Sequence, residues 1–182
     1  MTTAYINFHA PVNPLTAQHF MATCSQVITQ GHDNLYLMLS TPGGQVASGI
    51  TVYNFLLSLP VPITTHNIGN IDSIGNAIFL SGKTRLACKH STFMFHGVGF
   101  DIANQRFEEK NLRESLNSLL ADQQRIGDII SERTNISSDK VGELFREART
   151  KNSDDALEAG IIHKVCDLQI PPGSPIFTLV FD

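Results

Sequence analysis

Residues 35 to 59 constrain the fold most strongly, because they join a buried strand to a helix through a glycine-rich loop. Leu35–Leu39 is a short apolar run of strand length, typical of a strand covered on both faces. Ser40-Thr41-Pro42-Gly43-Gly44 follows and cannot lie inside a helix or a strand. Val46–Leu59 then places apolar residues at helical spacing. This order predicts a strand, a sharp loop and a helix that packs back on the sheet.

Strands and helices alternate in the same way through the first 100 residues. The apolar patterns there predict further strands at 5–8, 63–66, 85–88 and 92–96 and a further helix at 16–29. Such alternation predicts right-handed βαβ crossovers. The predicted fold class is therefore α/β with a largely parallel sheet.

The second half of the chain is dominated by one long amphipathic helix, predicted at 104–133. Its apolar residues recur at helical spacing on one face, namely Leu112, Leu116, Leu119, Ile126 and Ile130. Two shorter helices are predicted at 139–149 and 154–159, and two strands at 161–165 and 176–181. The long helix is the element most able to project from the body.

Composition limits the kind of protein. The 182 residues suit one domain, 1–182, and no linker or repeat divides them. The net charge of −4 disfavours a nucleic-acid-binding module, which is usually basic. Only 16% of residues are charged, against roughly 25% in an average soluble domain. Either the polar surface consists of Asn, Gln, Ser and Thr, or part of the surface is not free, since buried interfaces are depleted in charge.

The cysteines and the chain's apolar stretches bear on location. Cys24, Cys88 and Cys166 are widely spaced and odd in number, which indicates reduced thiols in the cytoplasm. Cys88 and His90 lack partners for a zinc site, so neither a metal nor a cofactor is predicted. The first ten residues do not form a secretory signal, and no stretch is long enough for a membrane helix.

Three segments could carry chemistry, and each also has a purely structural interpretation. The loop Ser40–Gly44 lets backbone N–H groups approach a ligand, or it is only a tight connection. Asp72–Ala77 places a serine before an apolar helix like a nucleophile turn, or it caps that helix. His96 lies at the exit of an apolar strand, where ligand sites form, or it has a structural role.

Taken together, the segments resemble the Clp protease proteolytic-subunit (ClpP-like) family and its crotonase-like relatives. The family's S-P-G-G loop is matched by Ser40–Gly44, its A-S-M-G-A nucleophile segment by Asp72–Ala77, and its M-I-H-Q strand end by Met94–Gly97. A later E-A-x-E-x-G-L-x-D element is echoed by Asp155–His163. The resemblance covers Tyr5–Val165 and implies repeated ββα units, a largely parallel sheet and a projecting "handle" helix at 104–133.

The resemblance also implies the roles of individual residues. Ser73 would be the nucleophile and His96 the general base that later protonates the leaving amine. The backbone N–H groups of Gly44 and Ile74 would form the oxyanion hole, where one donor contributes roughly 3–4 kcal/mol. The implied activity is a serine endopeptidase, acting on peptides or unfolded segments inside a self-assembled ring.

Two positions depart from the family pattern. The aspartate that orients the catalytic histidine in the family lies eight residues before the alanine at Ala156, where this sequence has Ala148. Glu147 is the neighbouring carboxylate and needs a register shift to serve, while Asp154 and Asp155 lie further along. Asp72, beside the nucleophile, would oppose a developing oxyanion.

These departures keep other functions open. The main alternative is a catalytically impaired ClpP-like paralogue, acting as a scaffold or regulatory subunit of the ring. A Ser–Lys dyad with Lys83 or Lys89 is a weaker alternative, and the signature of an acyl-CoA enzyme is not evident. The predicted partners are a peptide or unfolded substrate and further copies of the chain, in a ring or in stacked rings. An AAA+ ATPase partner stays open, because the family segment that meets it is essentially absent here.

Overall fold

The computed structural model describes residues 2–99 and 108–181. Its strands form one eight-stranded sheet with the path β6-β5-β3-β2-β1-β8, and β4 and β7 extend it beside β3. The bounds of the strands are β1 Thr3–His9, β2 Asn34–Thr41, β3 Ile63–Asp72, β4 Thr84–Ala87, β5 Thr92–Met94, β6 Thr150–Asn152, β7 Lys164–Val165 and β8 Ile176–Thr178. All pairings are parallel except that of β5 with β6, so the predicted fold class is confirmed.

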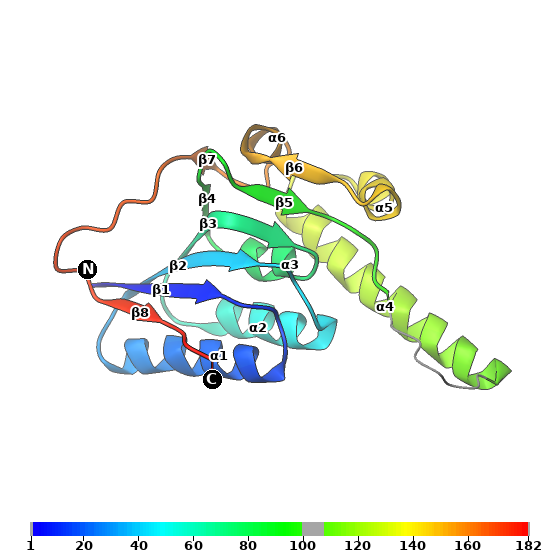
Figure 1. The fold of residues 1–182 in the computed structure, drawn as a ribbon, viewed down its shortest axis with the longest axis horizontal. Coiled ribbons are helices and arrows are strands. Elements are labelled where there is room, and N and C mark those ends of the chain that lie inside the picture. The colour runs from blue at the N-terminus through cyan, green and yellow to red at the C-terminus, as the bar shows by residue number, and fades with distance from the viewer. Residues whose placement is uncertain (1, 100–107, 182) are drawn as a thin grey trace.

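Six helices accompany the described strands: α1 Pro14–Thr29, α2 Val46–Ser58, α3 Gly75–Leu80, α4 Glu109–Arg133, α5 Ser138–Glu147 and α6 Ser153–Glu158. Figure 1 shows α1, α2 and α3 together on one face of the sheet, as the βαβ crossovers require. Asn13 caps α1: its side chain accepts from the Thr16 amide, and the Thr16 hydroxyl accepts from the Asn13 amide.

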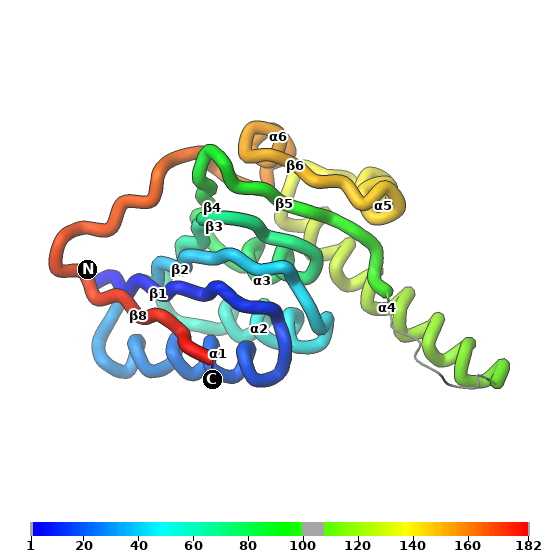
Figure 2. Tube along the Cα trace, in the orientation of Figure 1, coloured from blue at the N-terminus to red at the C-terminus, as the bar shows by residue number. Residues whose placement is uncertain are grey.

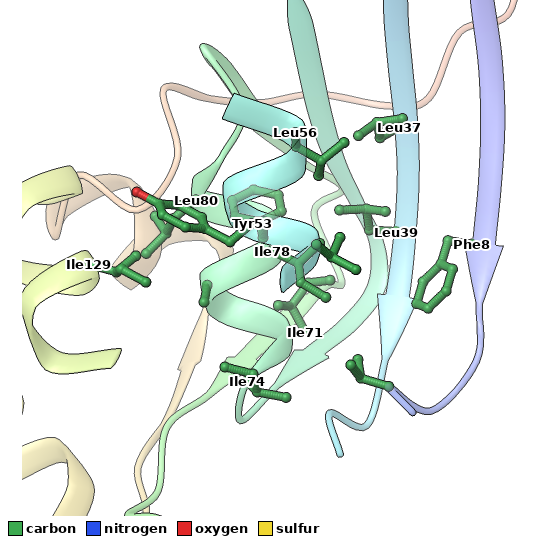
Figure 3. Close-up of a cluster of buried hydrophobic side chains, with 14 of the residues drawn as sticks. Phe8, Leu37, Leu39, Tyr53, Leu56, Ile71, Ile74, Ile78, Leu80 and Ile129 are labelled. Carbon is green, nitrogen blue, oxygen red and sulfur yellow. The ribbon is translucent and has the colours of Figure 1, made fainter. Parts of the chain in front are cut away.

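The hydrophobic core lies between the sheet and these helices. Strand side chains such as Leu37, Leu39 and Ile71 meet Leu56 of α2 and Ile78 of α3, all almost fully buried (Figure 3). Burying a side chain of this kind contributes about 1.5–3 kcal/mol. The core therefore fixes the relative positions of β2 and β3, the strands that precede the candidate catalytic segments.

The long helix α4 divides into two parts. At its carboxyl end Ile126, Ile129 and Ile130 are buried, whereas Leu112 and Leu116 near its beginning expose about half of their surface. Its 25 residues extend about 37 Å, and its first turns project away from the sheet (Figure 1). The helix was predicted at 104–133, and the first four residues of that range lie outside the described part.

The strands differ from the prediction in length and number. β3 continues to Asp72 rather than ending at residue 66, because Asn67 bonds Thr92 and Gly69, and Asn70 bonds the Thr41 carbonyl. The strand predicted at 161–165 keeps only Lys164–Val165, and the one at 176–181 only Ile176–Thr178. β6 was not predicted. β8 lies beside β1 although they are far apart in the sequence (Figure 2).

Candidate active site

Three neighbouring strands bring the candidate catalytic segments together. The glycine loop follows β2, Ser73 follows β3 and His96 lies two residues after β5. β5, β3 and β2 are adjacent and parallel, so their carboxyl ends meet at one edge of the sheet. Ligand sites of parallel sheets form at this edge. The topology therefore explains how segments that are distant in the sequence reach one place.

Ser73 occupies a strained turn between β3 and α3. Its φ is +56°, a left-handed conformation that is uncommon for residues other than glycine. The turn is fixed on both sides, since Ser73 N–H donates to the Met94 carbonyl at 2.9 Å and the Asn76 side chain donates to the Ser73 carbonyl at 3.0 Å. Strain held in place by such bonds is typical of functional sites.

Asn76 joins the serine turn to β5. Its Nδ2 donates both to the Ser73 carbonyl and, at 2.8 Å, to the Met94 carbonyl, and the side chain is 1% exposed. No role was predicted for this residue, although it stands inside the serine motif. The Met94 carbonyl thus accepts hydrogen bonds from the Ser73 amide and from the Asn76 side chain. These two bonds hold the turn against the strand that precedes His96.

The glycine loop lies directly against the serine turn. Gly43 has φ +84°, and a Cβ there would come within 2.7 Å of the Ser73 Cβ. Gly44 has φ +146°, and a Cβ there would lie 2.1 Å from the Val12 carbonyl oxygen. Val12 also clasps the loop, donating to Gly43 at 2.7 Å and accepting from Gln45 at 2.8 Å. Only glycine fits these two positions.

A small cavity of about 80 Å³ opens between these segments. Gly44, Ser73 and His96 line it together. Its remaining walls are largely apolar and come from α2, the segment after β5, α4 and α5: Val46, Phe95, Val98, Gly99, Ile126, Ile130 and Phe145. Ile74 does not line the cavity, because its side chain is buried against Gly49. Among the hydrogen bonds of the described residues, neither the Gly44 nor the Ile74 amide donates to a backbone carbonyl.

The orientation of the His96 ring is set by the backbone. Its Nδ1 lies 2.7 Å from the Gly97 carbonyl oxygen, and because a carbonyl can only accept, Nδ1 carries the hydrogen. In the neutral ring this leaves the lone pair on Nε2, the tautomer that a general base needs. The Gly97 contact could not be predicted from the sequence, since any residue supplies a carbonyl.

The segment after α5 lies opposite His96. Phe95 N–H donates to the Arg149 carbonyl and Gly97 N–H to the Phe145 carbonyl, at 2.9 and 3.1 Å. Glu147 and Ala148 fall between these two contacts. The alanine has no carboxylate, and the Glu147 carboxylate pairs instead with Arg149 at 2.5 Å. Within the described residues, no carboxylate bonds to His96.

The other charged candidates do not line the cavity that contains Ser73. The Asp72 carboxylate accepts a hydrogen bond from Asn70 at 2.6 Å. Lys83 lines a different cavity, and neither it nor Lys89 lines the one that contains Ser73. The structure therefore does not bring a lysine to the serine for a Ser–Lys dyad.

Metal ligands do not gather in the described part of the chain, where no three His, Cys, Asp or Glu side chains form a cluster. Cys88 contacts His66 at 3.5 Å.

No helix in the described ranges is both long and apolar enough to cross a membrane.

A family model for Clp protease matches residues 1–169. The chain belongs to the Clp protease family. ATP-dependent Clp protease proteolytic subunit 2 of Treponema pallidum (strain Nichols) is 25% identical to this Clp-family chain over 142 residues. The match covers 73% of this chain and 66% of that protein, slightly less than two thirds of its length.

The fold agrees with that of a solved Clp protein. A ClpP1 mutant from Listeria monocytogenes superposes on this Clp-family chain with a TM-score of 0.82. The superposition covers 91% of this chain and 92% of that one, at 15% sequence identity. The predicted ClpP-like fold is thereby confirmed.

Proposed function

We propose that this Clp-family protein is a serine peptidase in which Ser73 is the nucleophile and His96 the general base. The observation that carries the proposal is that Ser73, His96 and Gly44 line one cavity at the carboxyl ends of adjacent strands. The left-handed turn at Ser73 and its support by Asn76 add to it, because a nucleophile must be held in one position.

The chemistry follows from these positions. Ser73 Oγ attacks the scissile carbonyl carbon while its proton passes to Nε2 of His96. The tetrahedral oxyanion accepts hydrogen bonds from the Gly44 and Ile74 amides. Collapse of this intermediate breaks the C–N bond, and His96 returns the proton to the leaving amine. Water then hydrolyses the acyl-enzyme by the same route.

The Gly97 carbonyl supplies part of what a catalytic aspartate supplies. It holds the Nδ1 hydrogen, and with it the productive tautomer. It is neutral, however, and stabilises the imidazolium less than a carboxylate would. Because loss of the acid lowers turnover roughly 10⁴-fold in a serine protease, we expect slow turnover here.

Peptide hydrolysis tests the proposal. Turnover of a fluorogenic peptide library by the full chain is compared with that of Ser73→Ala and His96→Ala. Both substitutions should abolish the signal above background, whereas Ser25→Ala, at an exposed position on α1, should retain it. Activity that survives in Ser73→Ala would exclude the nucleophile. The name of the Treponema relative describes that protein as ATP-dependent. The assay on short peptides proposed here needs no ATPase.

Ala148 favours a second candidate function, a ring subunit without peptidase activity. The two candidates differ in reactivity at Ser73. A subunit without peptidase activity would neither hydrolyse peptides nor react with an acylating probe, yet it would still assemble.

We further propose that copies of the chain assemble through α4, as the resemblance implies. Leu112, Leu116 and Leu120 expose 47%, 52% and 51% of their surfaces on the projecting part of the helix. Such a stripe is costly in a free monomer and suits a subunit contact. Analytical ultracentrifugation should show an oligomer that Leu116→Glu with Leu120→Glu reduces in mass. A monodisperse wild-type monomer would contradict the assembly.

The three cysteines are free thiols, which suits the proposed cytoplasmic location.

A further inference from the structure

A second and larger cavity lies apart from the candidate active site. It measures about 440 Å³ and lies among the end of α2, the turn between α3 and β4, the end of α4 and the start of β7. The aliphatic part of its lining consists of Leu56, Leu57, Leu59, Val61, Pro62 and Ile63. None of its residues lines the cavity that contains Ser73.

The charged part of the lining is mainly cationic. Lys83, Arg85, Arg133 and His163 line the cavity, and Glu132 is the one carboxylate among the described residues that line it. Arg85 is only 7% exposed, so its charge is held largely out of water. Burying a charge is unfavourable unless other groups compensate it.

Hydrogen bonds to backbone carbonyls partly offset the cost of burying the charges of Arg85 and Arg133. Arg85 donates through Nε and Nη2 to the carbonyls of Ile161, Gly160 and Arg133 at 2.7–3.0 Å. Arg133 donates through Nε and Nη2 to the carbonyls of Leu80 and Ser81 at 3.1 and 3.4 Å. In the part of the chain that the structure describes, the Nη1 group of each arginine has no partner. Neither guanidinium forms a salt bridge with a carboxylate there.

The local potential is therefore positive. Arg133 lies close enough to Arg85 to disfavour its positive charge: burial and then Arg133 lower the pKa of Arg85. Burial, then Arg85 and Arg133, likewise lower the pKa of His163. His163 Nδ1 accepts from the Arg85 amide at 3.2 Å, which leaves a hydrogen on Nε2 of the neutral ring.

We infer that this cavity binds a small carboxylate that carries an aliphatic group, with the carboxylate on Lys83, Arg85 and Arg133. Guanidinium groups match carboxylate geometry, and the two Nη1 groups offer donors that no described protein group uses. The aliphatic lining residues then contact the ligand's hydrocarbon part. The volume equals that of roughly fifteen waters, enough for an amino acid with a blocked amine.

Calorimetry on the full chain at low salt tests the inference with three probes. N-acetyl-L-leucine carries both features, N-acetyl-L-leucinamide lacks the charge, and inorganic phosphate lacks the hydrocarbon. We expect saturable binding of the first, with Kd on the order of 1 mM for a ligand this small. The amide and phosphate should bind at least tenfold more weakly. Equal binding of either one, or no saturable binding of N-acetyl-L-leucine, would overturn the inference.

Three single variants locate the binding site. Lys83 and Glu132 are exposed, and their side chains form no hydrogen bond or ion pair in the described ranges, so their substitution should leave the thermal unfolding midpoint unchanged. Lys83→Gln should weaken binding of N-acetyl-L-leucine about three- to tenfold, and Glu132→Gln should tighten it by a similar factor. Lys89→Gln, an exposed lysine outside the cavity, is the control and should have no effect. Equal affinity in all three variants would place the ligand elsewhere and overturn the assignment.

Discussion

His96 donates its Nδ1 hydrogen to the carbonyl oxygen of Gly97, the next residue along the chain, at 2.7 Å. In the proposed catalytic pair, a backbone carbonyl would take the part that a carboxylate takes in a catalytic triad. The contact preserves the tautomer that leaves Nε2 free to accept a proton. Its neutrality predicts a peptidase that is competent but slow.

Restoring a carboxylate opposite His96 should raise activity. Ala148 lies in the segment that pairs with residues 95–97, and its φ is +49°, a conformation that aspartate tolerates better than most residues. Ala148→Asp should increase kcat at least tenfold, because the charge stabilises the imidazolium. Ala148→Asn is the matched control, having the same shape without the charge. The same kcat in both variants would show that position 148 does not act on His96.

Replacing Asn76 should lower kcat by more than the loss of folding stability explains. Asn76→Ala removes the bonds to the Ser73 and Met94 carbonyls and should destabilise the fold by about 1–3 kcal/mol. It should also lower kcat about tenfold with little change in KM, because the serine turn loosens. Asn67→Ala is the control, since this buried asparagine bonds Thr92 and Gly69 away from the serine. A similar loss of kcat in both variants would indicate a general effect of stability.

Two glycine substitutions should distinguish the effect of a steric clash from that of a positive φ angle alone. A Cβ at Gly44 would lie 2.1 Å from the Val12 carbonyl, so Gly44→Ala must displace the loop and should abolish peptidase activity. Gly173 also has a positive φ, +80°, but a Cβ added there would meet no described atom within 4 Å. Gly173→Ala should cost only about 1 kcal/mol and keep the activity. Full activity in Gly44→Ala would remove this loop from the catalytic site.

His66 should make stability depend on pH. It is fully buried between Tyr36 and the Cys166 carbonyl, and burial lowers its pKa below the ordinary 6.5. Below pH 6.5 the unfolded chain gains a proton that the folded chain does not, until the lower folded pKa is reached. The free energy of unfolding should therefore fall between about pH 7 and 5, by at most about 1.4 kcal/mol per pH unit from this residue.

Urea denaturation at several pH values measures this dependence. His66→Gln keeps an amide able to bond Tyr36 and Cys166 but does not titrate in this range, so it should flatten the profile. His163→Gln should remove a second contribution of the same sign, because the pKa of His163 is also lowered. An unchanged slope in His66→Gln would show that the buried ring does not cause the acid sensitivity.

The sequence could predict the parts of the fold that repeat a simple pattern. The apolar run of β2 and the helical spacing of α2 were found at nearly their observed bounds. The end of β3 was missed because Asn67 and Asn70 interrupt the apolar pattern and find their partners on other strands. β6 was missed because its three residues form a strand only by pairing with β5.

In the candidate site, too, the contacts made between distant segments could not be predicted from the sequence. The resemblance to the Clp protease family predicted Gly44, Ser73 and His96 in one site, and all three line one cavity. The Gly97 carbonyl and the two bonds of Asn76 depend on side-chain rotamers and on neighbouring strands. Such contacts leave no trace in the order of residue types, so only the structure could supply them.

Covalent labelling by a fluorophosphonate tests the assignment of Ser73 as the nucleophile, because it requires an activated serine and no particular peptide. Intact mass and peptide mapping of the full chain should show one adduct, on Ser73. His96→Ala should slow its formation at least a hundredfold, and Ser73→Ala should prevent it, while Ser25→Ala should label at the wild-type rate. An adduct that persists in Ser73→Ala, or the absence of any adduct on the wild-type chain, would show that Ser73 is not an activated nucleophile.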